Sequence, residues 1–303
     1  QTTLEEVVNH YLDNINQHNS TLHVFVEVYE EEALERAKAL DKKYETTPES
    51  VGKLFGLVIS IKDVLCHKNH IVSASSKMLE DFTSLFHATA VERLLAEDAI
   101  IIGRTNCDEF AMGSTNETSH FGATKNAIDK ERVPGGSSGG SAVSVQADMC
   151  LASLGSDTGG SVRQPAAWCN VIGLKPSYGR ISRHGLLAYA SSFDQIGPFT
   201  NNVEDSALLT QVMAGKDEYD STVSSEPVDD YSGVSKLEKK LKIGIPKQTI
   251  ESEGLNSEIK QKLIEISADL KSKGHQVEEF DFPFFDYLVP IYYVLTTAEA
   301  SSN

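Results

Sequence analysis

The pattern of hydrophobic and polar positions predicts that helices and strands alternate along the chain. Apolar residues recur every three to four positions in some stretches, and every second position or without interruption in others. Helices are expected over residues 4–15, 30–46, 89–97, 205–215 and 255–273, and strands over residues 22–29, 54–61, 99–103 and 241–246. A further helix leading into a short strand is expected over residues 142–155, and strands with loops over residues 171–200. This alternation predicts an α/β fold with a mostly parallel or mixed sheet.

Local signals indicate where several of these elements begin and end. Thr3 and Glu6 form a capping-box pattern in front of the first helix. Gly274 follows the helix over residues 255–273 as its expected carboxyl cap, and residues 241–283 together form a β–α–β unit. Residues 216–239 are polar and interrupted by proline, so we expect them to run over the surface.

The run LFGLVISI, residues 54–61, is continuously apolar and ends at Lys62-Asp63. Such a run is typical of a strand that is buried on both faces. Ligands of α/β proteins bind beyond the carboxyl ends of the strands. The run therefore predicts that Lys62 lies at a functional site.

Composition narrows the class of protein. The 303 residues are 40% hydrophobic, which is enough for a sizeable core. The formal net charge of −17 argues against direct binding of nucleic acid, because phosphates are bound by basic surfaces. No apolar segment approaches the length of a membrane span, so no membrane partner is expected. The cysteines are scattered without CxxC pairs and are expected to be reduced thiols of a cytoplasmic protein: Cys66, Cys107, Cys150 and Cys169.

The nearest pattern to a metal site is HKNH, from His67 to His70. It has no acidic or sulfur-bearing neighbour at a ligand spacing in the sequence. The sequence therefore predicts no metal site.

Two glycine–serine clusters, GGSSGGS and SDTGGS, raise three alternatives. A phosphate-binding loop would need a lysine and a serine or threonine after its glycines, and GGSSGGSA has no lysine there. A flexible linker would be low in complexity, whereas these clusters flank an apolar helix. A nucleophile with supporting backbone is the third alternative, because Gly159-Gly160 before Ser161 lets amide groups converge on one point.

A serine nucleophile also needs a base. The nearest histidines, His120 and His184, lie in no recognisable triad context. A lysine can serve if burial lowers its pKa towards neutrality, and Lys62 at the end of a buried strand is the best candidate. An exposed lysine in an ion pair is the competing interpretation of Lys62.

The residues that carry this chemistry also carry a resemblance. The segment GGSSGGSAVSVQADMCLASLGSDTGGSVRQPAA resembles the signature of the amidase signature family. The wider stretches LFGLVISIKDV, NCDEFAMGSTNETSHFGATKN and GLKPSYGRISRHGLLAYASSFDQIGP are most similar to its members from tRNA-dependent amidotransferases. The resemblance implies an amidase-signature fold, in which helices cover both faces of a large mixed central sheet. It covers essentially all of residues 1–303, which we expect to form one amidase domain, truncated at its carboxyl end relative to the family.

The resemblance implies a role for particular residues. The family's Ser–cis-Ser–Lys triad corresponds to Lys62 as base, Ser137 as proton bridge after a cis peptide bond, and Ser161 as nucleophile. The oxyanion hole corresponds to the N–H groups of Thr158, Gly159, Gly160 and Ser161. Supporting roles are expected for Ser138, Asp157 and Arg163, and contacts with substrate for Met112, Gly113, Ser114 and Tyr292.

The resemblance further implies the release of ammonia from glutamine through a covalent ester. The ammonia would pass to one of two partner subunits and amidate Glu-tRNA(Gln) or Asp-tRNA(Asn). ATP and Mg²⁺ would be used by that partner, which would also provide most of the contact with tRNA, so no cofactor is expected in this chain. Two alternatives remain: a stand-alone amidase acting on another small amide, and a non-catalytic scaffold subunit.

Overall fold

The computed structural model describes residues 2–233 and 239–303, which form two compact units. The first unit comprises residues 2–233 together with residues 299–303, and the second comprises residues 239–298. The division describes packing, and one amidase domain over residues 1–303 stays a prediction. None of the helices in the described ranges has the length and apolar character that crossing a membrane requires.

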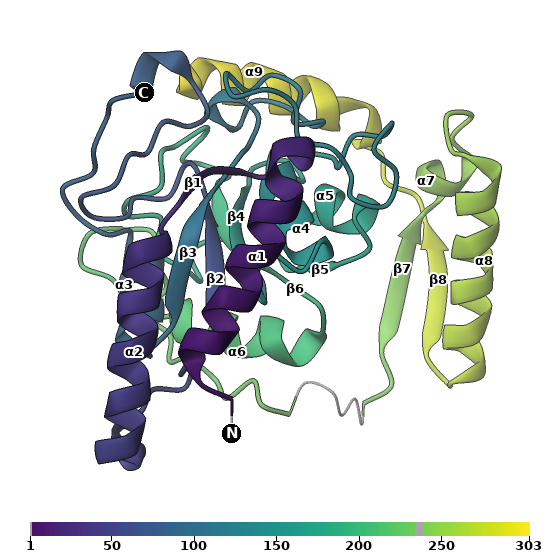
Figure 1. Ribbon diagram of the computed structural model, residues 1–303. Helices are drawn as coiled ribbons and strands as arrows, with labels where there is room; N and C mark the ends of the chain where they lie inside the picture. The colour runs from purple at the N-terminus through teal and green to yellow at the C-terminus, as the bar shows by residue number, and fades with distance from the viewer. Residues whose placement is uncertain (1, 234–238) are drawn as a thin grey trace. The chain divides into compact units, whose positions relative to one another are not determined.

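A six-stranded mixed sheet forms the centre of the first unit (Figure 1). Its strands are β1 (Phe25–Val28), β2 (Val58–Lys62), β3 (Ile100–Thr105), β4 (Ala152–Asp157), β5 (Ile172–Gly173) and β6 (Gln195–Thr200), in the spatial order β1-β3-β2-β4-β6-β5. Strand β2 is parallel to β3 and β4, whereas β1, β5 and β6 pair antiparallel with their neighbours. The carboxyl ends of β2, β3 and β4 therefore meet at one edge of the sheet, where Lys62 and Asp157 both lie.

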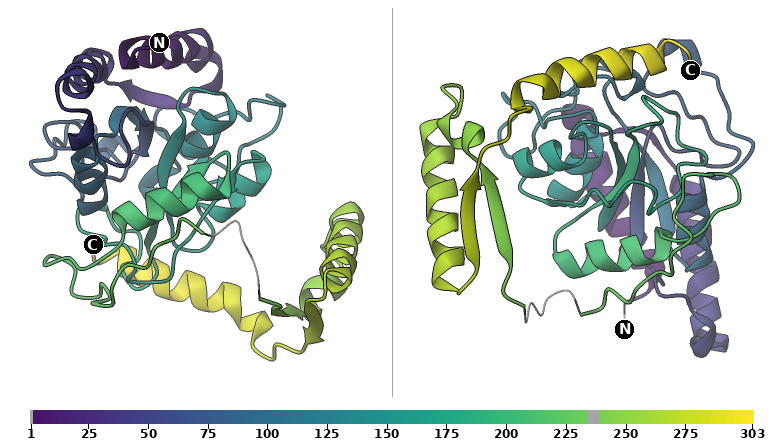
Figure 2. Two further views of the ribbon diagram at one scale, coloured as in Figure 1. Left: turned by 90° about the horizontal axis from the view of Figure 1, so that it is seen from below. Right: turned by 180° about the vertical axis from the view of Figure 1, so that it is seen from behind.

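Helices cover both faces of this sheet. They are α1 (Leu4–Leu22), α2 (Glu30–Thr46), α3 (Thr89–Ala96), α4 (Gly139–Gln146), α5 (Arg163–Trp168) and α6 (Val203–Met213). Figure 2, left, shows α1 and α2 on one side of the sheet and the green α6 on the other. On the first side, apolar residues of α1, α2 and α4 form one core with Val58, Ile100 and Ile102 of the strands. The mixed sheet with helices on both faces agrees with the predicted fold.

The second unit contains the expected β–α–β arrangement. Strands β7 (Lys242–Pro246) and β8 (Gln276–Phe280) are parallel, and α7 (Lys247–Glu251) and α8 (Ser257–Ser272) connect them. Gly274 has a φ of 85° just after α8, and its N–H donates to Lys271 O at 2.9 Å, so it ends the helix as predicted. Helix α9 (Leu288–Ala300) follows β8.

The structure moves several predicted boundaries. Helix α1 continues to Leu22, where the predicted strand over residues 22–29 was expected to begin. The run over residues 54–61 pairs as a strand only from Val58, because Leu54–Leu57 form a turn with Gly56 at a φ of 74°. The described part of the predicted surface stretch, residues 216–233, has neither helix nor strand. Residues 234–238 of that stretch lie outside the described residues.

One buried ion pair attaches the segment after β2 to its neighbour β3. Arg104 Nη1 donates to Asp63 Oδ1, and both side chains are almost completely buried. The remaining acceptor positions of Asp63 are filled by the amide groups of Ser73 and Ser75, at 2.8 and 2.7 Å, and by the Ser73 hydroxyl. Residues 63–75 are thereby fixed directly beside Lys62.

We expect Asp63→Asn to lower the free energy of unfolding by about 3 kcal/mol, because it removes the buried carboxylate partner of Arg104 and leaves this buried charge with the partly exposed Glu27. Urea unfolding followed by circular dichroism measures this loss. Asp81→Asn, at an exposed carboxylate, is the matched control and should change little. Equal effects of both substitutions would contradict the assigned role of the ion pair.

Candidate active site

Lys62 is the last residue of β2 and is completely buried. Its ammonium nitrogen lies 2.6 Å from Ser137 Oγ and 2.9 Å from Ser156 Oγ, and donates to both hydroxyl oxygens. No ion pair with a carboxylate is formed by Lys62 within the described ranges. The strand end thus holds an amine among hydroxyl groups, which excludes the surface ion pair considered above.

Burial lowers the pKa of the Lys62 ammonium below that of a free lysine. The acidic groups of Cys107, Asp108, Asp194 and Asp157 oppose this shift without reversing it. A neutral amine can accept a proton from the Ser137 hydroxyl across the same 2.6 Å contact. The geometry therefore supports Lys62 as a base.

The two glycine–serine clusters of the sequence meet at this strand end. The Ser138 amide donates to Ser161 O at 3.3 Å, and the Ser138 hydroxyl donates to Ser156 O at 3.1 Å. The Gly136–Ser137 peptide bond is cis, as the family resemblance implies. Ser138 thus links the two clusters through hydrogen bonds to backbone oxygens. None of its hydrogen bonds among the described residues involves Lys62.

Ser161 lies in the turn between β4 and α5 and is 7% exposed. Its hydroxyl has no hydrogen bond within residues 2–233 and 239–303, so it is not committed to another group. Gly160 immediately before it has a φ of 133°, a conformation that favours glycine. The turn therefore presents a serine hydroxyl that is free to react.

Asp157 fixes this turn. Its carboxylate accepts from Gly160 N at 2.8 Å, from Val162 N at 3.1 Å and from the Arg163 guanidinium at 3.0 Å. Burial opposes ionisation of Asp157, but the hydrogen bonds from Arg163 and the amide groups hold its pKa below the usual range. Asp157 and Arg163 therefore have the supporting positions that the sequence predicts.

The predicted oxyanion hole stays a prediction, and one of its N–H groups is bonded within the turn. The Gly160 N–H already donates to Asp157 Oδ1, so in this geometry it is not available to a developing oxyanion. The Gly159 and Ser161 N–H groups form no hydrogen bond with other described residues. Thr158 donates its hydroxyl to Asp194 Oδ1 at 2.6 Å, which anchors the start of the turn.

Four residues that sequence reasoning missed position the site. Ser156 is the second acceptor for Lys62, and Asp194 accepts from Tyr189 N, Ala190 N and Thr158. Gln164 accepts from Gly136 N at 2.9 Å and donates to Ser114 O at 3.0 Å. The buried Asp108 accepts from Asn116 N and the Thr118 hydroxyl, and it packs so closely on Gly136 that a side chain there would collide with it. Only the place of Ser156 within SDTGGS offered a signal in the sequence.

The predicted substrate-contact residues are divided between the two units. Ser114 and Gly113 lie beside the site: Ser114 O accepts a hydrogen bond from the Gln164 side chain, and Gly113 packs against Asp108. Met112 is 40% exposed on the same loop. Tyr292 belongs to α9 in the second unit, so its contact with a substrate stays a prediction.

A cavity of about 230 Å³ adjoins the anchored turn. Asp194, which holds Thr158, is part of its lining, together with Arg183, His184 and Asp220. Arg183 is paired with Asp220 at 3.0 Å, and His184 stacks on Tyr219 with 4.4 Å between ring centroids. These contacts give His184 a packing role and no place in a triad.

Known proteins are similar to this chain in sequence and in backbone fold. The sequence profile of the Amidase family matches residues 6–303. The A subunit of the glutamyl-tRNA(Gln) amidotransferase of Chlorobium limicola is 50% identical over 303 residues, covering 99% of this chain and 63% of that protein. The crystal structure of the corresponding A subunit from Thermotoga maritima superposes with a TM-score of 0.88 at 38% identity, over 99% of this chain and 63% of that one.

A third similar structure was described in connection with a different enzyme. The third is a chain of a protein complex that was described as revealing the evolutionary origins of an s-triazine catabolic enzyme. It superposes on this chain with a TM-score of 0.91 at 30% identity. The superposition covers 99% of this chain and 65% of that one. The present chain thus spans less than two thirds of each of these three relatives.

The depressed pKa of Lys62 predicts how stability depends on pH. Between that depressed pKa and the ordinary value of 10.5, the unfolded chain binds one more proton than the folded chain, so the free energy of unfolding rises with pH. Lys62→Met removes this contribution. We expect the stability of the wild type relative to Lys62→Met to rise with pH below the ordinary lysine value of 10.5 in urea unfolding.

Lys130→Met, at an exposed lysine, provides the control for this measurement. Its stability relative to the wild type should stay constant over the same pH range. A flat or falling difference for Lys62→Met would show that Lys62 is charged in the folded protein.

Proposed function

The chain belongs to the amidase family, and from this membership we propose that it is the glutamine-hydrolysing subunit of a tRNA-dependent amidotransferase. The observation that carries the proposal is the buried Lys62 amine in contact with Ser137, whose neighbour Ser138 donates its amide N–H to Ser161 O. The relatives that are A subunits of glutamyl-tRNA(Gln) amidotransferases support the choice of glutamine and of a misacylated tRNA as the final acceptor.

The proposed reaction is acyl transfer through a serine ester. Neutral Lys62 accepts a proton from Ser137, which takes one from Ser161 as Ser161 Oγ attacks the side-chain amide carbon of glutamine. The N–H groups of Gly159 and Ser161 stabilise the oxyanion. Ammonia leaves with a proton returned along the same path, and water then hydrolyses the ester to glutamate.

The residues around Lys62 fit this sequence of proton transfers. Ser137 and Ser156 satisfy the amine without a counter-charge, so the proton gained in the first step is held weakly and can be returned. Asp157 and Arg163 form an ion pair with each other beside the nucleophile, so Asp157 is not a charged partner of Lys62. The site needs no metal or cofactor of its own for these steps.

The proposal includes partners. The released ammonia would pass to a second subunit that activates the tRNA-linked carboxylate with ATP and Mg²⁺, and a third subunit would complete a heterotrimer. The net charge of −17 supports a tRNA contact provided mainly by the partner. Because tRNA aminoacylation is a cytoplasmic process, we place the complex in the cytoplasm.

The first test is Ser161→Ala in the complete protein with its partners. Removing the nucleophile should abolish glutamine hydrolysis and acyl-enzyme trapping, measured by glutamate release and by mass spectrometry. Ser153→Ala alters a buried serine within β4 and serves as the control, so it should leave turnover within a few fold of the wild type. Ordinary turnover by Ser161→Ala would refute the assignment of the nucleophile.

The second test separates the two hydroxyl partners of Lys62. Ser137→Ala interrupts the proton path and should lower kcat by about 10³. Ser156→Ala removes only an acceptor of the amine and should lower kcat by about tenfold, with a shift in the pH profile. Equal losses in both variants would contradict a unique bridging role for Ser137.

The choice between the proposal and its alternatives rests on the substrate. Conversion of Glu-tRNA(Gln) or Asp-tRNA(Asn) by the assembled complex supports the amidotransferase. Steady turnover of other amides without partners would favour a stand-alone amidase. Assembly without any acyl-enzyme would favour a scaffold subunit.

A further inference from the structure

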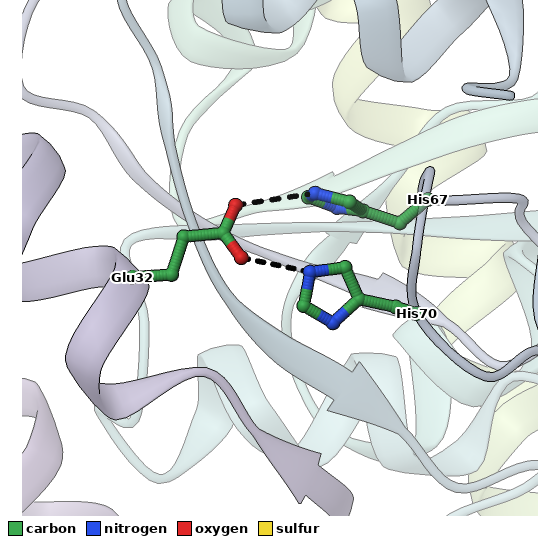
Figure 3. Close-up of side chains that lie close together, drawn as sticks. All are labelled: Glu32, His67 and His70. Atoms are coloured by element: carbon green, nitrogen blue, oxygen red, sulfur yellow. Dashed lines mark hydrogen bonds and ion pairs between the residues drawn. The ribbon is translucent and has the colours of Figure 1, made fainter.

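Three potential metal ligands converge away from the proposed active-site serines, although the sequence places them in two separate segments. Glu32 comes from the first turn of α2, and His67 and His70 come from the segment that follows β2 (Figure 3). His70 Nε2 lies 2.7 Å from Glu32 Oε2, and His67 Nε2 lies 3.5 Å from Glu32 Oε1. No two of the three potential ligand atoms are more than 4.8 Å apart.

The backbone holds the two imidazoles together. His70 N donates to His67 O at 3.1 Å, closing a turn in which Asn69 has a φ of 68°, a conformation that asparagine tolerates well. Two further hydrogen bonds attach this turn to Ser84. Asn69 N donates to Ser84 O at 2.7 Å, and Ser84 N donates to His70 O at 2.9 Å. The two imidazole centroids are 4.5 Å apart.

The cluster contains a buried polar atom that the protein does not satisfy. His67 is 3% exposed, and its Nδ1 has no hydrogen-bond partner among the described residues. Within residues 2–233 and 239–303, the polar contact of this ring is the one from Nε2 to Glu32. A bound cation could therefore take over the contact at Nε2 without breaking any other hydrogen bond of this ring.

Two imidazole nitrogens and one carboxylate are a donor set that suits a borderline cation. Zn²⁺ binds such ligands at about 2.0–2.2 Å in a tetrahedron, which places ligand atoms about 3.4 Å apart. The observed separations of 2.7 and 3.5 Å lie on either side of this value. Glu32 is 51% exposed and can adjust, while the fixed turn keeps both histidines in place.

We propose that Glu32, His67 and His70 bind one divalent transition-metal ion of the Zn²⁺ class, with water completing the coordination. The ion would replace the hydrogen bonds of Glu32 and crosslink the first turn of α2 to residues 67–70. Those residues lie within the segment, residues 63–75, that Asp63 attaches to β3 beside Lys62. The site would therefore stabilise the segment that leaves the Lys62 strand, and it has no part in the reaction itself.

A fourth histidine lies close by but is engaged elsewhere. The His87 ring centroid is 4.9 Å from that of His67, and its Nδ1 accepts from Lys68 N at 3.2 Å. In the neutral ring this leaves the proton on Nε2, where a metal would have to bind. His87 is therefore outside the proposed ligand set and serves as a control.

The test is Zn²⁺ binding by the complete protein once its metals have been removed with a chelator. Isothermal titration with ZnCl₂ should give one site, and the thermal midpoint should rise with Zn²⁺ because binding favours the folded state. Glu32→Gln and His70→Gln should each weaken binding at least tenfold. Co²⁺ in place of Zn²⁺ should give the visible absorption of a tetrahedral site in the wild type, and this absorption should be lost in Glu32→Gln and His70→Gln.

Two control variants make the outcome specific. His120→Gln alters an isolated histidine–glutamate pair at 3.7 Å, and His87→Gln alters the neighbouring ring, so both should bind Zn²⁺ like the wild type. Circular dichroism with chelator present should show that every variant is folded. Absence of a wild-type site, or equal Zn²⁺ binding by Glu32→Gln, His70→Gln and wild type, would overturn the proposal.

Discussion

The arrangement of the active site depends on an amine that is buried without a counter-charge. Lys62 closes β2 inside the protein and contacts two hydroxyl groups, Ser137 and Ser156, but forms no ion pair with any described carboxylate. Burial of a charge without a partner is costly, so the pKa of Lys62 falls and the neutral base becomes accessible. A carboxylate in contact with Lys62 would stabilise the ammonium form and remove this property.

The surrounding acidic side chains are accordingly occupied by other groups. Asp157 is neutralised by Arg163 and amide groups, and Asp108 accepts from the loop over residues 116–118. Asp194 accepts from two amide groups and from Thr158, and burial raises its pKa. Each carboxylate thus fixes a loop of the site, and the three charges oppose the lowering of the Lys62 pKa without reversing it. The same hydrogen bonds determine which amide groups of the glycine turn remain free.

The proposed metal site and the active site are linked through one segment of the chain. Residues 63–75 leave the Lys62 strand, are attached to β3 by Asp63 and contain the turn that carries His67 and His70. A cation at that turn would add a second anchor, to α2, in addition to the ion pair between Asp63 and Arg104. Both anchors would act on the stability of the segment, and neither supplies a reacting group.

The order of helices and strands and the mixed α/β class could be predicted from the sequence, because the period of hydrophobic residues is a local property. The triad roles, which were assigned from the long signature, stay predictions. The beginning of β2 at Val58 could not be predicted, because the turn before it depends on hydrogen bonds formed by neighbouring residues in the folded chain. Ser156, Gln164 and Asp194 were missed for a similar reason: each contacts residues far away in sequence. Glu32 shows the limit most clearly, since it lies 38 positions before His70 and only the packing of α2 brings them together. The sequence by itself determined which residues can do chemistry, and the tertiary structure decided which of them meet, because contacts between distant segments depend on how the sheet and its helices pack.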